Sequence, residues 1–290
     1  MKETEGASRG SRVPDKLYEG YVFDLDGTIY LGDELLPGAK RMVEKIREHG
    51  KRVVFLSNNP TKGLKDYVEK LTRLGLPTPE DDIVNTVVTA TEYLLQNHPD
   101  ATVYPISEEP LKVALSEAGI RMSEEPSEID IVIASYDRGF EYKKLQIAFD
   151  AIWFHKRAWL MMTNPDRYCP FPGGRGEPDA AAIVGAIEGC TGERCRVNVG
   201  KPSPVMLETI EKMLGLDAKD CVMTGDRLYT EIRMAKDAGM PSVVVLTGET
   251  KAEDLESEPP ENLPEFVLDR IDKLIPPGIW KESGWTENDG

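Results

Sequence analysis

Two aspartates stand close together at the end of a short apolar run near the start of the chain. The segment FDLDGT places Asp24 and Asp26 on either side of one leucine, and Gly27 and Thr28 follow. A spacing of two puts both carboxylates on one side of an extended strand. Ligands of open α/β sheets bind beyond the carboxyl ends of the strands. Neighbouring carboxylates repel, so a cation or a proton normally accompanies them; on its own the segment would also suit an acidic turn.

Three further segments place polar groups where other predicted strands end. Ser57 and Asn58 follow the run RVVFL, and a hydroxyl with backbone amides can hold a phosphate oxygen there. Lys201, in VGKPSP, precedes a helix start and can neutralise an anionic substrate. Asp226 ends a predicted strand in TGDRLYTEI, and Glu231 lies about one helical turn beyond it. Carboxylate oxygens with waters are the ligands that Mg²⁺ prefers.

The scarcity of histidine and cysteine narrows the chemistry. The 290-residue chain has 3 histidines, and turn, capping or packing roles explain them best. A Ser-His-Asp triad or a His-rich zinc site is therefore disfavoured. The 4 cysteines form no C-x-x-C pair, which favours reduced thiols. The working groups should be carboxylates, hydroxyls, lysine and amides.

The charge of the chain excludes some partners. Acidic residues number 51 against 35 basic ones, so the formal net charge is −16. Binding to nucleic acid needs a basic face, and binding to anionic membranes needs one too. No apolar stretch of about 18 residues is present, and the polar start of the chain lacks the apolar core of a signal peptide. We predict a cytoplasmic protein with no nucleic-acid or membrane partner, whose residues 1–17 form a mobile tail.

Alternating strands and helices must position these side chains. Apolar residues recur at helical spacing over residues 39–46 and 64–74, each run ends at a glycine, and β-branched runs separate them. The alternation returns late in the chain with CRVNVG, DCVMTGD, PSVVVLTG and EFVLDRI, which we predict to be strands of the same sheet. This order predicts an α/β fold with a Rossmann-like parallel sheet core.

The middle of the chain has strands and helices of its own. Its strands are TVYPI, DIVIASY and AWLMMTN. We predict an inserted α/β cap domain at residues 89–192, with the core made of residues 18–88 and 193–290. Near the end of the chain, Trp280 and Trp285 could pack on the core or serve an interface, and packing is the simpler interpretation.

Four motifs in this order resemble those of phosphatases of the haloacid dehalogenase (HAD) superfamily. The similarity is to the subclass with a C2-type α/β cap between the second and third motifs, in the p-nitrophenyl phosphatase-like and sugar-phosphate phosphatase branch. It covers residues 18–275 and includes D-x-D-G-T, the Ser or Thr after the second strand, the Lys, and G-D-x-x-x-T-D. Glu231 departs from the pattern, which usually has aspartate there; its longer arm would reach a metal through water.

The resemblance implies a Mg²⁺-dependent phosphomonoesterase that forms an aspartyl phosphate. Asp24 would be the nucleophile, Asp26 the general acid and base, and Lys201 would neutralise charge on the phosphoryl group. The implied metal-binding residues are Asp24, Asp26 through its carbonyl, Asp226 and Glu231. The implied phosphate-binding residues are Ser57, Asn58, Lys201, Thr28 and Gly27.

The inserted domain would act as a lid and select the leaving group. Asn164, Asp166 and Arg167, in TNPDRYCPFPGGRGEPD, are candidate contacts, although an ordinary surface loop would have the same composition. Sugar phosphates are favoured as substrates, with phosphoglycolate, glycerol phosphate and nucleoside monophosphates open. A phosphomutase, a phospho-acceptor signalling domain and a non-catalytic sugar-phosphate binder are the alternatives. Capped relatives often dimerise through the cap, which leaves a homodimer open.

Overall fold

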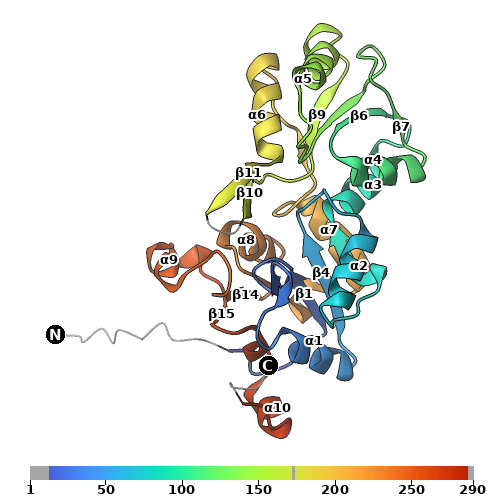
Figure 1. The fold of residues 1–290 in the computed structure, drawn as a ribbon. Helices are drawn as coiled ribbons and strands as arrows, with labels where there is room; N and C mark the ends of the chain where they lie inside the picture. The colour runs from blue at the N-terminus through green and yellow to red at the C-terminus, as the bar shows by residue number, and fades with distance from the viewer. Residues whose placement is uncertain (1–12, 172–173, 287–290) are drawn as a thin grey trace, which may run out of the picture. The chain divides into compact units, whose positions relative to one another are not determined.

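The computed structural model describes residues 13–171 and 174–286. Contacts group the chain into two compact units: residues up to 53 together with residues from 216 onward, and residues 54–215. These boundaries differ from the predicted domain joints near residues 88 and 193, and the predicted joints stay a prediction. Both units contain parallel strands with helices against them, so the predicted α/β fold is confirmed (Figure 1).

The first unit contains a parallel sheet in which β13 pairs with β1 and β14, and β14 pairs with β15. Its strands are almost entirely buried, as expected of parallel strands covered on both faces. The predicted helix near residue 39 is confirmed, because α1 buries Ala39, Met42, Val43 and Ile46 along one face. The elements are β1 (Gly20–Asp24), β2 (Tyr30–Leu31), β3 (Glu34–Leu35), α1 (Ala39–Glu48), η3 (Ala218–Asp220), β13 (Cys221–Gly225), η4 (Leu228–Ile232), α8 (Arg233–Asp237), β14 (Ser242–Val245), α9 (Ala252–Ser257), η5 (Pro260–Asn262), β15 (Phe266–Leu268), η6 (Ile271–Leu274) and α10 (Pro277–Glu282).

The second unit contains the parallel pair β4 and β5 and a separate five-stranded sheet. The order of the five-stranded sheet is β12-β9-β8-β6-β7, and its paired strands are all parallel. The elements are β4 (Arg52–Ser57), which begins in the first unit, α2 (Leu64–Arg73), η1 (Glu80–Asp82), β5 (Ile83–Asn85), α3 (Thr86–Asn97), β6 (Thr102–Ile106), α4 (Glu109–Glu117), β7 (Arg121–Met122), β8 (Ile131–Ala134), α5 (Tyr142–Phe149), η2 (Asp150–Phe154), β9 (Trp159–Met162), β10 (Tyr168–Phe171), β11 (Arg175–Pro178), α6 (Ala180–Thr191), β12 (Val197–Asn198) and α7 (Pro204–Leu214).

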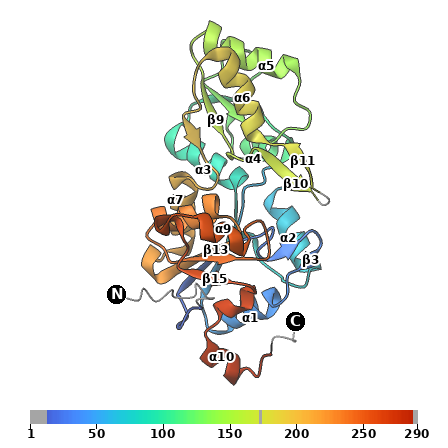
Figure 2. The same ribbon diagram turned by 90° about the vertical axis from the view of Figure 1, so that its left-hand side faces the viewer.

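Helices cover both faces of the five-stranded sheet. Val132 and Ala134 of β8 pack in a cluster with residues of α5 and α6, whereas Ile131 and Ile133 pack in another with residues of α3 and α4. This alternation is the period of two that a strand imposes on its side chains. Figure 1 shows α5 and α6 beside one face and α3 and α4 beside the other. The antiparallel pair β10–β11 projects next to the start of α6 (Figure 2).

One predicted strand belongs to a different sheet. We predicted that CRVNVG would join the core sheet, but β12 within it pairs with β9, with Val197 opposite Met161 and Asn198 opposite Met162. The prediction was wrong because a short β-branched run carries no signal about its distant hydrogen-bonding partner. Lys201 therefore follows the edge strand of the five-stranded sheet.

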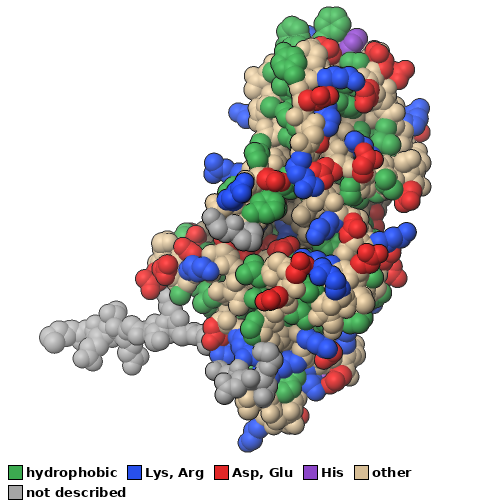
Figure 3. Space-filling view, viewed as in Figure 1, with side chains coloured by type: hydrophobic (Ala, Val, Ile, Leu, Met, Phe, Trp, Pro, Cys, Tyr) green, Lys and Arg blue, Asp and Glu red, His purple; other side chains and the backbone are tan. Residues whose placement is uncertain are grey.

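Acidic and basic side chains are interspersed over the face of the protein drawn in Figure 3. Within residues 13–171 and 174–286, no helix has the length and apolar character that crossing a bilayer requires. All four cysteines are free thiols. The predicted tail at residues 1–17 falls mostly outside the described residues.

Candidate active site

The first strand ends at a tight turn that presents two aspartates differently. Asp24 is buried at the end of β1, whereas Asp26 is exposed in the turn, where its carboxylate accepts a hydrogen bond from the Tyr30 hydroxyl at 3.3 Å. Gly27 has a φ of +84°, which favours glycine, and a Cβ there would lie 2.5 Å from the carboxylate of Asp226. Asp26 therefore lies in the turn beyond β1, and its side chain differs in exposure from that of Asp24.

Asp226 stands at the carboxyl end of the strand paired with β1. The register sets Phe23 opposite Thr224, so Asp24 and Asp226 follow at neighbouring strand ends. Asp226 is 3% exposed, and its Oδ2 accepts the backbone N–H of Glu249 at 2.7 Å. Asp24 and Asp226, which belong to separate motifs, therefore lie at the same edge of the sheet.

Buried acids surround Arg227. Burial by itself lowers the pKa of this guanidinium, but nearby acidic groups raise it above its ordinary value on balance; these groups are Tyr229, Asp226, Glu231 and Asp24. Glu231 is 1% exposed, and its Oε2 accepts the Thr230 hydroxyl at 2.8 Å. The predicted acids Asp24, Asp226 and Glu231 thus all contribute to raising the pKa of Arg227.

Sequence reasoning missed Glu249. Its carboxylate pairs with Arg227 Nε at 2.9 Å and accepts the Tyr229 hydroxyl at 2.8 Å, while its own N–H binds Asp226. Glu249 lies in the loop after β14 and belongs to no local sequence motif. Its contacts with Arg227, Tyr229 and Asp226 are therefore visible only in the folded structure.

Ser57 accepts a hydrogen bond from Tyr67, a residue that the sequence pattern placed only on an apolar helix face. Ser57 is 5% exposed, and its Oγ accepts the Tyr67 hydroxyl at 2.8 Å and the Asn59 N–H at 3.2 Å. Because both contacts are made to the lone pairs of Oγ, the Ser57 proton can be donated elsewhere. The hydroxyl of Ser57 therefore keeps a proton that it can donate to a further acceptor.

Tyr67→Phe should lower kcat/KM for a phosphate ester by about 2- to 10-fold, because one hydrogen bond of net about 0.5–1.5 kcal/mol is lost. The measurement is steady-state kinetics on p-nitrophenyl phosphate with urea unfolding in parallel. Tyr142→Phe is the matched control, since Tyr142 is 78% exposed. Unchanged kcat/KM in a folded Tyr67→Phe protein would show that Ser57 needs no such support.

The side-chain amide of Asn58 binds the main chain of Lys201. The Lys201 N–H donates to Asn58 Oδ1 at 2.7 Å, and Asn58 Nδ2 donates to the Lys201 carbonyl at 3.2 Å. The Lys201 side chain is almost wholly buried, with the residue 3% exposed. The second unit therefore brings together the predicted phosphate-binding residues Ser57, Asn58 and Lys201.

The three residues predicted to contact the substrate differ in their surroundings. Asn164 is wholly buried, and its Nδ2 donates to Asp166 at 3.0 Å and to Asp179 at 3.1 Å. Asp166 also accepts Asn58 Nδ2 at 3.0 Å. Arg167 is exposed. Their use in substrate selection stays a prediction.

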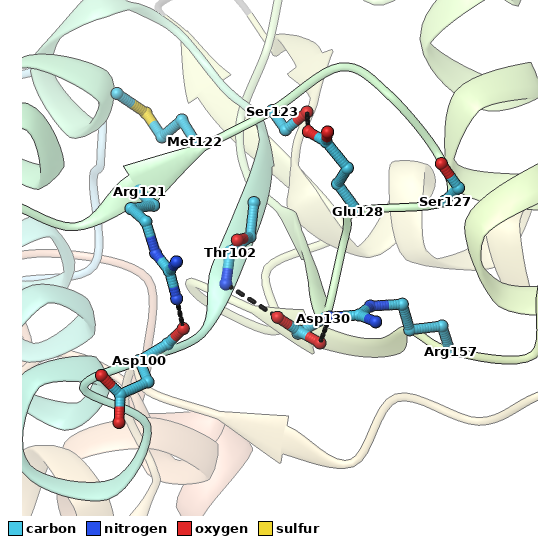
Figure 4. A pocket seen from close by; sticks show the side chains of 9 residues that line it. All are labelled: Asp100, Thr102, Arg121, Met122, Ser123, Ser127, Glu128, Asp130 and Arg157. Atoms are coloured by element: carbon cyan, nitrogen blue, oxygen red, sulfur yellow. Dashed lines mark hydrogen bonds and ion pairs between the residues drawn. The ribbon is translucent and has the colours of Figure 1, made fainter.

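Two cavities have none of the predicted site residues in their walls. One of about 570 Å³ lies in the second unit, near the amino ends of β6, β7 and β8. Figure 4 shows its polar groups bonded to each other: Asp130 binds the Thr102 N–H at 2.9 Å and Arg157 at 2.8 Å. Another, of about 770 Å³, lies in the first unit and includes Tyr229 and Glu249 in its wall. Neither is lined by the predicted catalytic residues.

The residues of the first unit suit a hard divalent cation. Among the described residues, no group of three or more His, Cys, Asp or Glu side chains is placed to hold a metal by itself. Asp24 and Asp226 nevertheless supply two buried carboxylates at paired strand ends, and the Asp26 carbonyl lies in the adjoining turn. Mg²⁺ commonly takes one or two carboxylates and completes its shell with waters and substrate oxygens. The donor set therefore fits Mg²⁺.

The chain is similar in sequence to known protein families. Residues 21–121 match the haloacid dehalogenase-like hydrolase family, and residues 198–274 match a HAD-hydrolase-like family. The sugar-phosphatase AraL of Bacillus subtilis is 34% identical, with 90% of this chain and 94% of the relative covered.

Solved structures agree with these matches. The 4-nitrophenylphosphatase of Thermotoga maritima has a TM-score of 0.83 at 35% identity, over 89% of this chain and 96% of the other. A glycerol phosphate phosphatase of Mycobacterium tuberculosis, in complex with magnesium, has a TM-score of 0.80 at 27% identity, over 89% and 76%. On these similarities and on its own strand-end acids, the chain belongs to the haloacid dehalogenase-like hydrolases and is a phosphatase.

Proposed function

We propose that this chain is a Mg²⁺-dependent phosphomonoesterase that hydrolyses small phosphorylated metabolites, sugar phosphates first, through an aspartyl phosphate. The observation that carries the proposal is the pair of buried acids, Asp24 and Asp226, at the carboxyl ends of the paired strands β1 and β13. Such strand ends are where α/β folds bind and transform ligands.

Two aspartates divide the chemistry. A carboxylate oxygen of Asp24 attacks phosphorus and forms an O–P bond while the bond from phosphorus to the leaving oxygen breaks. Asp26 gives its proton to that oxygen and then takes a proton from the water that cleaves the acyl phosphate. Inorganic phosphate leaves and both aspartates return to their starting states. The exposure of Asp26 suits a group that exchanges protons with substrate and water.

We assign phosphate binding to the residues of the sequence motifs. Ser57 donates through the hydroxyl that Tyr67 orients, and Lys201 supplies positive charge against the equatorial phosphate oxygens. The amides near Asn58 add further donors. The buried hydroxyl of Thr28 has no hydrogen-bond partner among the described residues, as expected of a group that serves a bound ligand. Gly27 shapes the turn.

Asp24, the Asp26 carbonyl and Asp226 would hold Mg²⁺, with Glu231 acting through water. When bound, the ion would neutralise charge as the anionic substrate approaches Asp24. The magnesium in the glycerol phosphate phosphatase structure supports this assignment by similarity.

The favoured substrate class rests on similarity to the sugar phosphatase relative. Phosphoglycolate, glycerol phosphate and nucleoside monophosphates remain alternatives, and a screen of phosphorylated metabolites ranked by kcat/KM distinguishes them. An isomeric sugar phosphate formed without free phosphate would instead identify a phosphomutase. Binding with no turnover would identify a non-catalytic sugar-phosphate binder.

We further propose that residues 89–192 act as a cap over the core formed by residues 18–88 and 193–290, with Asn164, Asp166 and Arg167 on the cap side. We also propose a cytoplasmic location without nucleic-acid or membrane partners, consistent with the net charge of −16. A homodimer through the cap is supported by its exposed aromatic residues Tyr142, Trp153 and Phe154. Sedimentation tests the dimer.

Asp26→Ala tests the proposed reaction. We expect kcat to fall by about 100- to 10,000-fold, because general acid–base help is lost. The loss should be larger for an alkyl phosphate than for p-nitrophenyl phosphate, since an alkoxide needs a proton to leave and a nitrophenolate hardly does. Phosphate release is measured with both esters, with Mg²⁺ present and after chelation.

Chelation should stop turnover of the unchanged enzyme, and added Mg²⁺ should restore it. Glu34→Ala is the control, because Glu34 is an exposed acid in the nearby β2–β3 hairpin. If Asp26→Ala lowers kcat equally for both esters, Asp26 does not protonate the leaving group.

A further inference from the structure

Asp166 joins two distant parts of the second unit through a single oxygen. Its Oδ2 accepts Nδ2 of Asn58, which follows β4, and Nδ2 of Asn164, which follows β9, each at 3.0 Å. Both donors are side-chain amides held in place by other contacts. Asn164 is wholly buried, and its Oδ1 accepts the Thr163 hydroxyl at 2.8 Å.

The same network is anchored in the helix that follows the β10–β11 pair. Nδ2 of Asn164 also donates to Asp179 at 3.1 Å, and Asp179 caps α6 by accepting the Ala180 N–H at 2.6 Å. The Asp166 carbonyl accepts the Ala181 N–H at 3.1 Å. Asp166 is therefore fixed by both its main chain and its side chain, which makes it a rigid support.

Asn58 connects Asp166 to Lys201 through hydrogen bonds. Its two amide atoms bind the N–H and the carbonyl of Lys201 at 2.7 and 3.2 Å, so the orientation of the Asn58 amide sets the main chain there. The preceding Gly200 approaches closely: a Cβ would lie 2.4 Å from the Thr163 carbonyl oxygen and 2.8 Å from Asn58 Oδ1. Little free space is left for the Lys201 loop to shift once Asn58 is held.

We propose that Asp166 is a positioning residue of the phosphate-binding site, which acts through Asn58 on the main chain at Lys201. This rests on the proposed function, in which Asn58 and Lys201 bind the phosphate. It reassigns Asp166 and Asn164 from direct substrate contacts to supports, because the amide donors of Asn164 both bind protein carboxylates. The position of the loop after β9 thereby fixes the positions of Asn58 and Lys201.

Asp166→Ala tests the proposal because it removes the shared acceptor. The dissociation constant for inorganic phosphate, measured by calorimetry in Mg²⁺ buffer, should rise by about 10-fold, and kcat/KM for p-nitrophenyl phosphate should fall by about 10- to 100-fold through misplacement. Asp166→Asn should restore most of both, since one amide oxygen can replace Oδ2 for both donors. Asp100→Ala, an exposed acid in the same unit, is the control and should change neither value.

A double-mutant cycle with Asn58→Ala separates positioning from a merely structural role. If Asp166 acts through Asn58, the double variant should lose little more than either single variant. Additive losses of phosphate affinity in the double variant would show that Asp166 does not act through Asn58. A folded Asp166→Ala protein with unchanged phosphate affinity would overturn the whole proposal. Asp166→Ser, whose short hydroxyl does not reach both amides, replaces Asp166→Ala if that protein does not fold.

The same experiment distinguishes failure of the proposal from failure of the proposed function. Turnover that depends on Asp24 but not on Asp166 leaves the phosphatase intact and removes the positioning role. Phosphate binding that weakens in Asp166→Ala, in a protein that turns over no ester, leaves the positioning role and removes the reaction.

Discussion

Asp24→Asn should abolish phosphate-ester turnover, lowering kcat by about 10,000-fold or more, while the protein stays folded. Asparagine has nearly the shape of aspartate, but its amide is a poor nucleophile and cannot form the acyl phosphate. The substitution also removes one negative charge from a region where Asp226 and Glu231 are buried nearby. We therefore expect the free energy of unfolding to stay the same or to rise, because like charges repel less.

Release of p-nitrophenol and urea unfolding are measured on the same preparation. Asp217→Asn is the control, since Asp217 is an exposed acid with 74% side-chain exposure. Trapped phosphoprotein provides a second readout, because Asp24→Asn should form none. A variant that keeps more than about one hundredth of the activity would contradict the assignment of Asp24, since loss of a covalent nucleophile normally costs far more.

Asp272→Ala should destabilise the protein by about 3–5 kcal/mol, because it breaks a buried ion pair from one side. Asp272 is wholly buried, and its carboxylate binds Arg41 Nε at 2.7 Å and Arg270 Nη2 at 3.0 Å. The two arginine side chains are only 14% and 16% exposed, so water cannot replace the lost charge well. The guanidinium of Arg41 also lies 4.8 Å from the ring centre of Trp280 and 4.7 Å from that of Trp285.

Urea unfolding measures this effect, with far-ultraviolet circular dichroism as the signal. Asp237→Ala is the matched control, because Asp237 pairs with Arg233 at 3.6 Å on the surface, where a pair contributes about 0–1 kcal/mol. Equal destabilisation by the two substitutions would show that the buried arrangement adds nothing. Under folding conditions, kcat should stay close to that of the unchanged protein, since Asp272 has no assigned part in the reaction.

Local sequence patterns predicted the elements that carry the acids. The helical spacing at residues 39–46 and the apolar run before Asp24 both depend on neighbours a few residues away, and the structure confirms α1 and β1. Packing of Trp280 and Trp285 was also predicted; both are half-buried, and the Arg41 guanidinium lies over both rings. Such features are readable because the backbone period and local burial leave a direct pattern in the sequence.

Other features were missed because they depend on residues far apart in the chain. Tyr67 matched an apolar stripe, and nothing in its own segment shows that its hydroxyl reaches Ser57. Asn164 lies in a segment rich in Gly and Pro, which usually lies on the surface, and nothing in that segment shows that its side chain is wholly buried and binds Asp166 and Asp179.

The sequence by itself determined which chemical groups are available: the acids of FDLDGT and GDRLYTEI, the hydroxyl of Ser57 and the charge of Lys201, each at the end of a predicted strand or turn. These follow from local backbone preferences and side-chain chemistry. Only the tertiary structure decided that Lys201 follows an edge strand paired with β9, and that Asp166 reaches it through Asn58. Strand partners and buried hydrogen bonds are chosen by competition among all segments of the folded chain, so no single segment contains that choice.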